Sequence, residues 1–520
     1  MIRICSGMLR DSSVPQQMIL NKERVFAMAN KNTNKISDFF RSMGTGLKNF
    51  GTAFAGYFRD FGTAVVKGDI WVKLSLLIMG AGYFARKQIV NGILMMLVQI
   101  GFILMLVLYG IPNLAKFGSL GTVPYEQTFD PLTMKATINN YDNSFLILLN
   151  SIIMLFIIFV FILFYIHNLK CVYRLQKKQA NGEHINTFKE DLRVMVNGKF
   201  HITLLTLPTL GVVIMNILPI LVLIAVAFTN YDQNHMPPNA LFHWVGFANF
   251  KSLFANSMTI TFGYAFRKIL GWTLLWAVLA TFTTFFGGIL LAKAINSKTT
   301  KWPKMWRTLF IIAIAVPQFV TLLLVRNFFA DTGIVNTICS NLGITGFLQH
   351  VGLVSKSINY IPFLTEEHWA KVMIVLINIW VGVPYQMLIA TGVLMNIPVD
   401  QLESARIDGA NKFQIFWKIT MPYIMIVQGP ALITDFVKNI NNFNVIYLLT
   451  QDVYITPDQA LANSNGKEVD LLVTWLFRLT NEYYNYKMAS VIGLIVFIIC
   501  AAFTLVSFSK MMKRNGEGGM

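Results

Sequence analysis

Long apolar segments separated by short polar ones make up most of this chain. Each apolar segment reaches about the 20 residues that an α-helix needs to cross the hydrocarbon core of a bilayer. This pattern predicts an all-α integral membrane protein with about eight transmembrane helices. The predicted spans are 92–111, 145–166, 202–228, 269–295, 308–325, 372–395, 424–449 and 488–508.

The residues before the first predicted span follow a helical pattern. Apolar and aromatic side chains recur every three or four residues, which puts them on one helix face, while basic side chains lie elsewhere. We expect this helix to lie in the membrane interface, with a soluble partner-binding helix as the alternative. The predicted apolar face comprises Phe39, Met43, Leu47, Phe50, Phe54, Tyr57 and Phe61.

Segment 71–87 is apolar but offers only a short stretch between Lys73 and Arg86. This stretch is shorter than the about 20 residues that a transmembrane helix needs, so we interpret it as a second interfacial or re-entrant segment. If it does cross, there are nine spans and the amino terminus lies on the other side. Residues 1–15 lack the apolar core and cleavage site of a secretory signal, so we expect no removable segment there, and either Met1 or Met28 could be the start.

Lysines and arginines give the chain a net charge of +18, although charged residues are only 13% of it. They cluster after the second, fourth, sixth and eighth predicted spans, and the opposite loops are sparser. By the positive-inside rule, this asymmetry predicts a multi-pass cell-membrane protein with both termini in the cytoplasm. The basic surplus is then topological, and we expect no nucleic acid as a partner because no basic and aromatic binding module accompanies it.

Motifs of common active sites are absent from the sequence. It has no phosphate-binding G-x-x-x-x-G-K-[ST] loop, no H-E-x-x-H and no nucleophile elbow, and its seven histidines lack ligand spacing. The four cysteines lie in different segments and predict no disulfide framework. We therefore expect a chain that is not an enzyme and that holds no metal and no cofactor.

A loop between the sixth and seventh predicted spans, residues 396–424, has clear helix start and stop signals. Pro398 ends one helix, and the helix formers after it restart the chain on the cytoplasmic side. Asp408 and Gly409 then break this helix, and Pro422 opens the next span. The loop therefore predicts a short helix outside the membrane, in a position where another protein can bind it.

The spacing in this loop resembles that of the permease subunits of ATP-binding-cassette (ABC) importers. Those subunits share Glu-Ala-Ala, three residues, Gly, nine residues, Ile, one residue and Leu-Pro, from which this chain departs at Ser404 and Met421. The resemblance implies a type I ABC importer permease fold, in which this loop is a coupling helix that docks into a cytoplasmic ATPase. It assigns ATPase coupling to Glu403, Ser404, Ala405, Asp408, Gly409, Ala410, Ile419 and Pro422.

Other stretches resemble the carbohydrate-uptake branch of these permeases. Examples are FTNYD at 228–232, HWVGFANF at 243–250 and IAVPQFV at 314–320, and the resemblance covers residue 204 to the carboxyl end. Two spans before this six-helix core make the chain most similar to the larger maltose/maltodextrin permease subunit. The implied partners are a second permease subunit in a heterodimer, a cytoplasmic ABC ATPase dimer that hydrolyses ATP, an extracytoplasmic sugar-binding protein and the oligosaccharide substrate.

The chain is then expected to comprise four regions. These are a cytoplasmic or interfacial amphipathic region (1–90), two additional transmembrane helices with a basic cytoplasmic loop (91–200), the six-helix permease core with the coupling loop (201–510) and a basic tail (511–520).

The seventh predicted span is unusually polar. If residues 432–449 form one helix, Asp435, Asn439 and Asn442 lie on one stripe with Lys438 beside it, and an aromatic stripe adjoins them, formed by Phe436, Phe443 and Tyr447. Ionisable groups at this depth are costly and should face a wet cavity or a partner. Amides suit hydroxyl groups and aromatic rings suit sugar ring faces, so we predict half of a sugar translocation site.

Two alternatives stay open for this stripe. The amides could simply bond neighbouring helices, and Lys438 could neutralise Asp435. The resemblance adds two further lining segments, in which prolines would kink the helix and free backbone groups toward a cavity. Their residues are Gln318 beside Pro317, and Asn378, Val381 and Gly382 just before Pro384.

Rival functions and substrates remain at this stage. An ion-coupled secondary transporter would show internal repeats and several intramembrane carboxylates, whereas Asp435 is the only carboxylate in the predicted spans. An integral membrane enzyme such as a glycosyl transferase would show carboxylate clusters at the membrane surface. Among substrates, maltose and maltodextrins come first, galacto-oligosaccharides second, and glycerol phosphate last because no cationic cluster is evident.

Overall fold

The computed structural model describes residues 51–52, 55–130, 135–255, 262–297 and 299–517, which are mostly helical. Within these residues, six helices are long and apolar enough to cross a membrane. They match the first, second, third, fourth, sixth and eighth predicted spans. Their bounds are Ile89–Lys116, Ser144–Ala180, Phe200–Ala227, Phe262–Ile295, Glu367–Met395 and Tyr486–Met511.

The other two predicted spans are present, but each is divided into two helices. In the fifth, α12 (Pro303–Ala315) and α13 (Gln318–Phe328) are separated by Val316 and Pro317, whose backbone is extended. In the seventh, α19 (Met421–Ile440) and α20 (Phe443–Thr450) are separated by Asn441 and Asn442. The prediction of one continuous helix over 432–449 is therefore wrong. Asparagine favours helix ends because its side chain bonds nearby backbone groups.

In the part of the chain that the structure describes, three helices contain a wider π turn, and each such turn ends two residues before a proline. A proline lacks the amide hydrogen of the helix ladder and collides with the carbonyl four residues earlier, and a π turn relieves that conflict. The three segments are α4 (Ile89–Met105) with η1 (Leu106–Gly110) and α5 (Ile111–Lys116) at Pro112, α8 (Phe200–Val212) with η2 (Val213–Ile217) and α9 (Leu218–Ala227) at Pro219, and α18 (Lys412–Ile415) with η4 (Phe416–Thr420) and α19 at Pro422.

The chain forms two compact units, Met1–Leu108 with Leu155–Thr209 (unit 1) and Tyr109–Met154 with Leu210–Met520 (unit 2). In unit 1, α4 and the second part of α6 (Ser144–Ala180) accompany α2 (Ile70–Leu74), α3 (Ala81–Phe84) and α7 (Phe188–Val196). A small core holds this unit together, formed by Ala64, Val72, Tyr83, Leu169 and Val172. The four predicted regions stay predictions.

Two predictions concern the start of unit 1. Segment 71–87 forms only the short helices α2 and α3, neither of which is long enough to cross a membrane. Residues 55–67 are helical, as the amphipathic pattern predicts. Tyr57 bonds the Leu163 carbonyl oxygen at 3.2 Å, and Phe61 packs on the core of unit 1. Phe39, Met43, Leu47, Phe50 and Phe54 of the predicted face lie outside the described residues.

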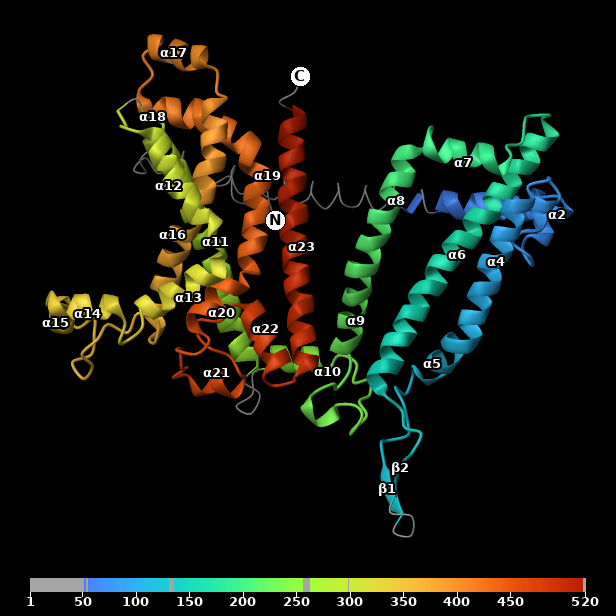
Figure 1. The fold of residues 1–520 in the computed structure, drawn as a ribbon, viewed down its shortest axis with the longest axis horizontal. Helices are drawn as coiled ribbons and strands as arrows, with labels where there is room; N and C mark the ends of the chain where they lie inside the picture. Colours follow the sequence, from blue (N-terminus) through green and yellow to red (C-terminus); the bar gives the residue numbers. More distant parts are fainter. Residues whose placement is uncertain (1–50, 53–54, 131–134, 256–261, 298, 518–520) are drawn as a thin grey trace, which may run out of the picture. The chain divides into compact units, whose positions relative to one another are not determined.

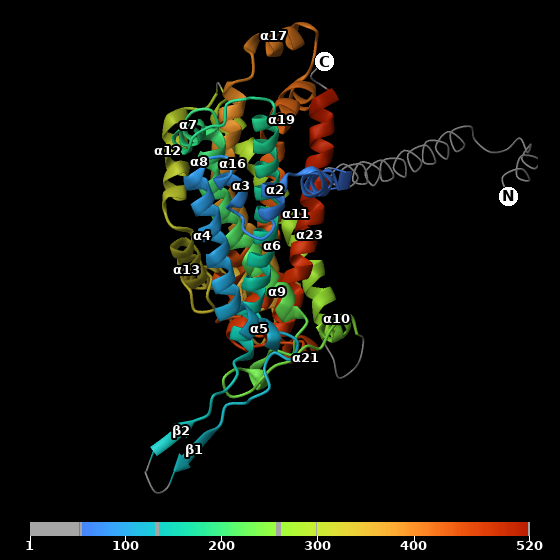
Figure 2. The ribbon, with the colours of Figure 1, turned by 90° about the vertical axis from the view of Figure 1, so that its right-hand side faces the viewer.

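Unit 2 is built around α11 (Phe262–Ile295), α16 (Glu367–Met395), α19 and α23 (Tyr486–Glu517). The helix α17 (Val399–Ile407) lies at one end of this bundle and α21 (Gln459–Asn463) at the opposite end (Figure 1; Figure 2). Close contact between α11 and α16 depends on glycines, because a Cβ atom at Gly288 would lie 2.4 Å from Cβ of Gln386. Small residues at such contacts let two membrane helices approach closely.

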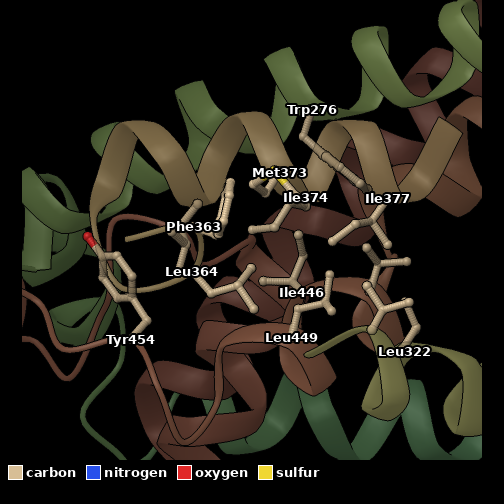
Figure 3. Close-up of a cluster of buried hydrophobic side chains, with 14 of the residues drawn as sticks. Trp276, Leu322, Phe363, Leu364, Met373, Ile374, Ile377, Ile446, Leu449 and Tyr454 are labelled. Carbon is tan, nitrogen blue, oxygen red and sulfur yellow. The ribbon is translucent and has the colours of Figure 1, made fainter. Parts of the chain in front are cut away.

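A buried apolar cluster fixes the second halves of the two divided spans (Figure 3). The helices α13 and α20 pack against each other and contribute Leu322, Ile446 and Leu449 to this cluster. Trp276 of α11 and Ile374 of α16 complete it on the other side. The core of unit 2 therefore holds α13 and α20 against each other.

The remaining described elements of unit 2 are short. A two-stranded antiparallel sheet pairs Gln127 with Ile138 and Asp130 with Lys135. The bounds are β1 (Gln127–Asp130), β2 (Lys135–Ile138), η3 (Gln233–His235), α10 (Ala248–Phe254), α14 (Ile334–Asn341), α15 (Ile344–Val351) and α22 (Leu472–Asn481).

Candidate functional site

A cavity of about 510 Å³ lies in unit 2 where the two helix breaks meet α16. The volume is within the range of about 300–1,000 Å³ typical of small-ligand sites. All of the residues predicted as substrate-binding line it, although they come from separate spans. They are Gln318, Asn378, Val381, Gly382, Asp435, Lys438, Asn439 and Asn442.

The break between α12 and α13 brings Gln318 to the cavity. Val316 and Pro317 are extended, so the helix hydrogen-bond ladder stops at Ala315 and restarts at Gln318. The predicted proline kink is thus a full interruption at Pro317. At Pro384, by contrast, α16 continues as one helix, and the kink predicted there stays a prediction.

Asp435 is held by the opposite wall of the cavity. Its Oδ2 accepts a hydrogen bond of 2.7 Å from Nε2 of Gln386 in α16. Over the described part of the chain, no ion pair joins Lys438 to Asp435 or to another carboxylate, and the Lys438 side chain is exposed to the cavity. A direct ion pair between Lys438 and Asp435 is therefore not found, and both side chains line the cavity.

Asn439 and Asn442 both bond neighbouring groups of the bundle and line the cavity, the two roles that the sequence left open. Nδ2 of Asn439 donates to Oγ1 of Thr281 in α11 at 2.9 Å, while Nδ2 of Asn442 donates to Oδ1 of Asn439 at 3.3 Å. Oδ1 of Asn442 accepts from the Val445 amide at 3.4 Å and caps α20. Both amides bond within the bundle, and both also line the cavity.

The predicted aromatic stripe does not form, because the break turns α20 away from the line of α19. Phe436 packs on Phe503 of α23, with ring centroids 4.3 Å apart. Phe443 lines the cavity and stacks on Tyr447, with ring centroids 4.5 Å apart. Only Phe443 of the predicted stripe therefore reaches the site.

Several lining residues were missed by the sequence reasoning. Trp380 and Tyr385 in α16 bring aromatic rings to the cavity, and Gln386 brings the amide that binds Asp435. A polar residue inside a predicted span was a usable signal for Gln386, because the argument applied to Asp435 also applies to it. The aromatic rings gave no such signal. The remaining missed residues are Thr284, Ile314, Val316, Pro317, Thr321, Pro384, Asn441 and Asn444.

Gly382 has a packing role as well as a place in the cavity wall. A Cβ atom there would lie 2.8 Å from Cγ2 of Thr284, so the glycine allows α11 and α16 to approach. Asn378 is buried, and the described residues give its amide no hydrogen-bond partner. Within the described residues, no group of His, Cys, Asp or Glu is arranged to hold a metal ion. The site thus offers amides, one carboxylate, one ammonium and aromatic rings.

The predicted coupling loop folds as a short exposed helix between two breaks. The helix α17 ends in a Schellman motif, in which the Ala410 amide bonds the Ala405 carbonyl at 2.9 Å and the Gly409 amide bonds that of Arg406 at 3.1 Å. Gly409 has a φ of +78°, a conformation that glycine adopts without steric cost.

The remaining coupling residues are placed around this helix. Glu403, Ser404 and Asp408 are exposed, Ile419 lies in the π turn η4, and Pro422 is in the first turn of α19. Glu403 makes no side-chain hydrogen bond within the described residues, so it is not a local cap. Among apolar side chains, Ile407 is 86% exposed and Phe413 is 71% exposed. Such exposure marks a candidate protein contact.

The chain has clear similarity to known proteins. Residues 285–513 match the family described as binding-protein-dependent transport system inner membrane component. The chain is 31% identical over 444 residues to the maltodextrin transport system permease protein MdxF of Bacillus subtilis, covering 85% of this chain and 95% of that protein. It is 30% identical over 443 residues to the maltodextrin transport system permease protein MalC of Streptococcus pneumoniae, covering 84% of this chain and 94% of that protein. It is also 30% identical over 442 residues to the galactooligosaccharides transport system permease protein GanP of Bacillus subtilis. That alignment covers 85% of this chain and 97% of that protein.

Proposed function

Because this chain belongs to the permease subunits of ABC sugar importers, we propose that it forms the translocation path for maltodextrin-type oligosaccharides. The cavity between the two divided spans and α16 is the sugar site. ATP is hydrolysed on a separate subunit, and both termini lie in the cytoplasm. A second permease subunit, an ABC ATPase dimer and an extracytoplasmic sugar-binding protein complete the transporter.

One observation carries the proposal: polar residues from separate spans converge on a single cavity. An uncharged oligosaccharide presents hydroxyl groups and flat apolar ring faces. The amides of Gln318, Asn378 and Asn444 can donate and accept hydrogen bonds with hydroxyls, and Trp380 and Phe443 can cover ring faces. This mixture suits a polyol better than an ion or an apolar ligand.

Maltodextrin is the preferred substrate because two of the relatives described above are named for maltodextrin transport. The alignment with this chain covers nearly the full length of both relatives. A galacto-oligosaccharide is the second candidate, since a relative of similar identity and coverage is named for that substrate. Both sugars offer the same hydroxyl chemistry to the amides. Their linkages differ, so the shape of the cavity would distinguish them.

The exposed helix α17 is the proposed contact with the ATPase. Ile407 and Phe413 expose apolar surface beside the free carboxylate of Glu403, which is a combination that a cleft on a partner would bury and pair. Gly409 would let the partner approach the backbone closely, because it has no side chain. Movement of this contact during ATP hydrolysis would then act on the spans at both ends of the loop.

Transport assays test this function. Cells with and without the gene should be compared for uptake of labelled maltotriose and galactobiose, before and after an uncoupler collapses the proton gradient while ATP is maintained. We expect gene-dependent maltotriose uptake that survives the uncoupler. Uptake that disappears with the gradient would contradict an ATP-driven importer, and uptake of galactobiose alone would replace the substrate while keeping the mechanism.

A further inference from the structure

A second cavity, of about 830 Å³, lies within unit 1. One wall is the turn from α3 into α4, residues 85–90, and the other is the loop that leads from α6 into α7. Both walls belong to the basic side of this unit, where Lys177, Lys178 and Lys189 also lie. The sugar site lies in the other unit, so the transport path does not account for this cavity.

Two nearly buried side chains at this cavity have polar atoms without partners among the described residues. Arg86 is only 4% exposed; it donates to the Gly82 carbonyl and to Asp69, each at 2.8 Å, but its Nε has no acceptor. Gln88 is 7% exposed and donates to the Asn186 carbonyl at 2.7 Å, but its Oε1 has no donor. Buried polar groups are normally hydrogen-bonded, so the wall of the cavity beside these two atoms has unmet hydrogen-bonding capacity.

The backbone holds Lys87 at this cavity in an uncommon conformation. Its φ is +61°, and the Gln88 amide bonds the Tyr83 carbonyl at 3.0 Å, so a lysine occupies the position of a helix-ending Schellman motif that glycine usually fills. The helix α4 then begins at Ile89 without a side-chain cap. No side chain caps the first backbone amides of α4, so they remain available to bond a ligand. Such amides at the start of a helix bind anions favourably.

Charges around the cavity also favour an anion. Lys87 and Lys189 line it, and over the described residues neither has an ion-pair partner. The one carboxylate in the wall, Glu183, accepts a hydrogen bond of 3.0 Å from Asn181. His184 also lines the cavity and lies 3.0 Å from Glu190. Beside the wall, Asp69 is paired with Arg86, and Asp191 accepts hydrogen bonds from Asn186 and Asn91. The two lysines are thus the cationic groups of the wall that are left without an ion-pair partner among the described residues.

An apolar face continues from the cavity along a membrane-crossing helix. Ile89, which lines the cavity, is 60% exposed, and the exposed Ile93 and Leu97 follow it on the same stripe of α4. Val90 begins a parallel stripe with Leu94. A ligand that fits both parts has an anionic head and long apolar tails, which a free phosphate lacks.

We propose that this cavity binds the phosphate of an anionic membrane phospholipid, whose acyl chains lie along the exposed face of α4. Lys87 and Lys189 neutralise the phosphate, and the uncapped start of α4 supplies backbone donors. The lipid would fix the turn from α3 into α4 against the loop before α7.

Photocrosslinking of the reconstituted full-length chain tests the proposal. Bilayers of phosphatidylcholine would contain a trace of photoactivatable phosphatidylglycerol, and labelled peptides would be mapped by mass spectrometry. Two variants remove the charges, Lys87→Gly, which keeps the left-handed turn without strain, and Lys189→Gln. Lys178→Gln, an exposed lysine of the same basic region outside the cavity, is the control.

We expect labelling of peptides that contain residues 85–90 or 183–189. Each cavity lysine removed should weaken labelling about fivefold, because one basic residue near an anionic membrane contributes about that factor in affinity. The control variant should label like the wild type. Unchanged labelling in Lys87→Gly and Lys189→Gln, or equal labelling by photoactivatable phosphatidylcholine, would overturn the proposal. Competition by soluble glycerol 3-phosphate would overturn it in favour of a site for free phosphates.

Discussion

The side-chain amide of Gln386 in α16 donates a hydrogen bond to the carboxylate of Asp435 in α19, with 2.7 Å between Nε2 and Oδ2. This bond joins two walls of the cavity that the sequence separates by 49 residues. Among the described residues, Lys438 on the same helix forms no ion pair with this carboxylate. The carboxylate that lines the cavity is thus held by a side chain from a different helix.

We expect Gln386→Ala and Asp435→Ala to be coupled in stability. A hydrogen bond to a charged group contributes about 1.5–3 kcal/mol, and partial exposure to the cavity places this one near the lower end. Each variant should lower the free energy of unfolding in detergent, and the double variant should lower it little more than one alone. Gln318→Ala with Asp435→Ala is the control pair, whose effects should add. Additive effects in the first pair would show that the bond contributes nothing.

Substitution of Asn442 should separate its cap from its cavity amide. Asn442→Ala removes the cap of α20 and should lower the free energy of unfolding by about 1 kcal/mol while weakening sugar uptake. Asn442→Asp keeps an oxygen that can cap the Val445 amide, so it should restore stability but not uptake. Uptake assays and chemical unfolding measure the two effects. Full uptake by Asn442→Asp would mean that Asn442 acts only as a helix cap.

Gly409 provides a test of close docking at α17. Asparagine tolerates the left-handed conformation, and a Cβ atom at Gly409 would meet no atom of the chain within 4 Å. Gly409→Asn should therefore fold normally yet lose uptake and copurification of the ATPase, because its side chain enters the proposed interface. Gly182 also has a positive φ and open surroundings, so Gly182→Asn is the matched control and should keep both. Normal uptake by Gly409→Asn would contradict close docking.

The short helix α21, which Asp458 caps, should loosen at low pH. Burial raises the pKa of Asp458, but hydrogen bonds from Lys268 and Tyr264 outweigh it and lower that pKa to about 2. A lowered folded pKa stabilises the fold above the unfolded value of 3.8, and this contribution is lost as pH falls from about 4 toward 2.

Amide hydrogen exchange of residues 458–463 at pH 5 and pH 3 would measure this change. We expect less protection at the lower pH than the intrinsic exchange rate alone predicts. In Asp458→Asn, protection corrected for the intrinsic exchange rate should be weaker than in the wild type at both pH values. It should be the same at pH 5 and pH 3. Equal protection of the wild type at the two pH values would contradict the role of this ion pair.

Much of the fold follows from local patterns in the sequence. The continuous spans were predictable because their apolar length matches a bilayer, and α17 was predictable because Pro398 and Gly409 act on the backbone directly. The convergence of Gln318, Asn378 and Asn442 on one cavity was predictable only with the family resemblance. The division at Asn441 was not predicted, because helical spacing assumes a continuous helix and cannot tell a polar stripe from two helix ends.

Contacts between distant elements lay beyond local patterns. The bond between Gln386 and Asp435 depends on how α16 and α19 lie against each other in the bundle, because the two residues are 49 positions apart in the sequence. The same limit applies to Phe436, whose ring turns to Phe503 although its spacing resembles that of Phe443. In both cases tertiary packing decides which neighbour a side chain meets.

The glycine contact between α11 and α16 has a mechanical consequence. Only Asn396, Ile397 and Pro398 separate α16 from α17, so a displacement of α17 is delivered almost directly to α16. Since the backbones of α16 and α11 are nearly in contact, we expect these two helices to move as one rigid pair. The other two sides of the cavity are spans that are interrupted at Pro317 and at Asn441. Rotation about these two breaks would change the cavity volume without bending a continuous helix.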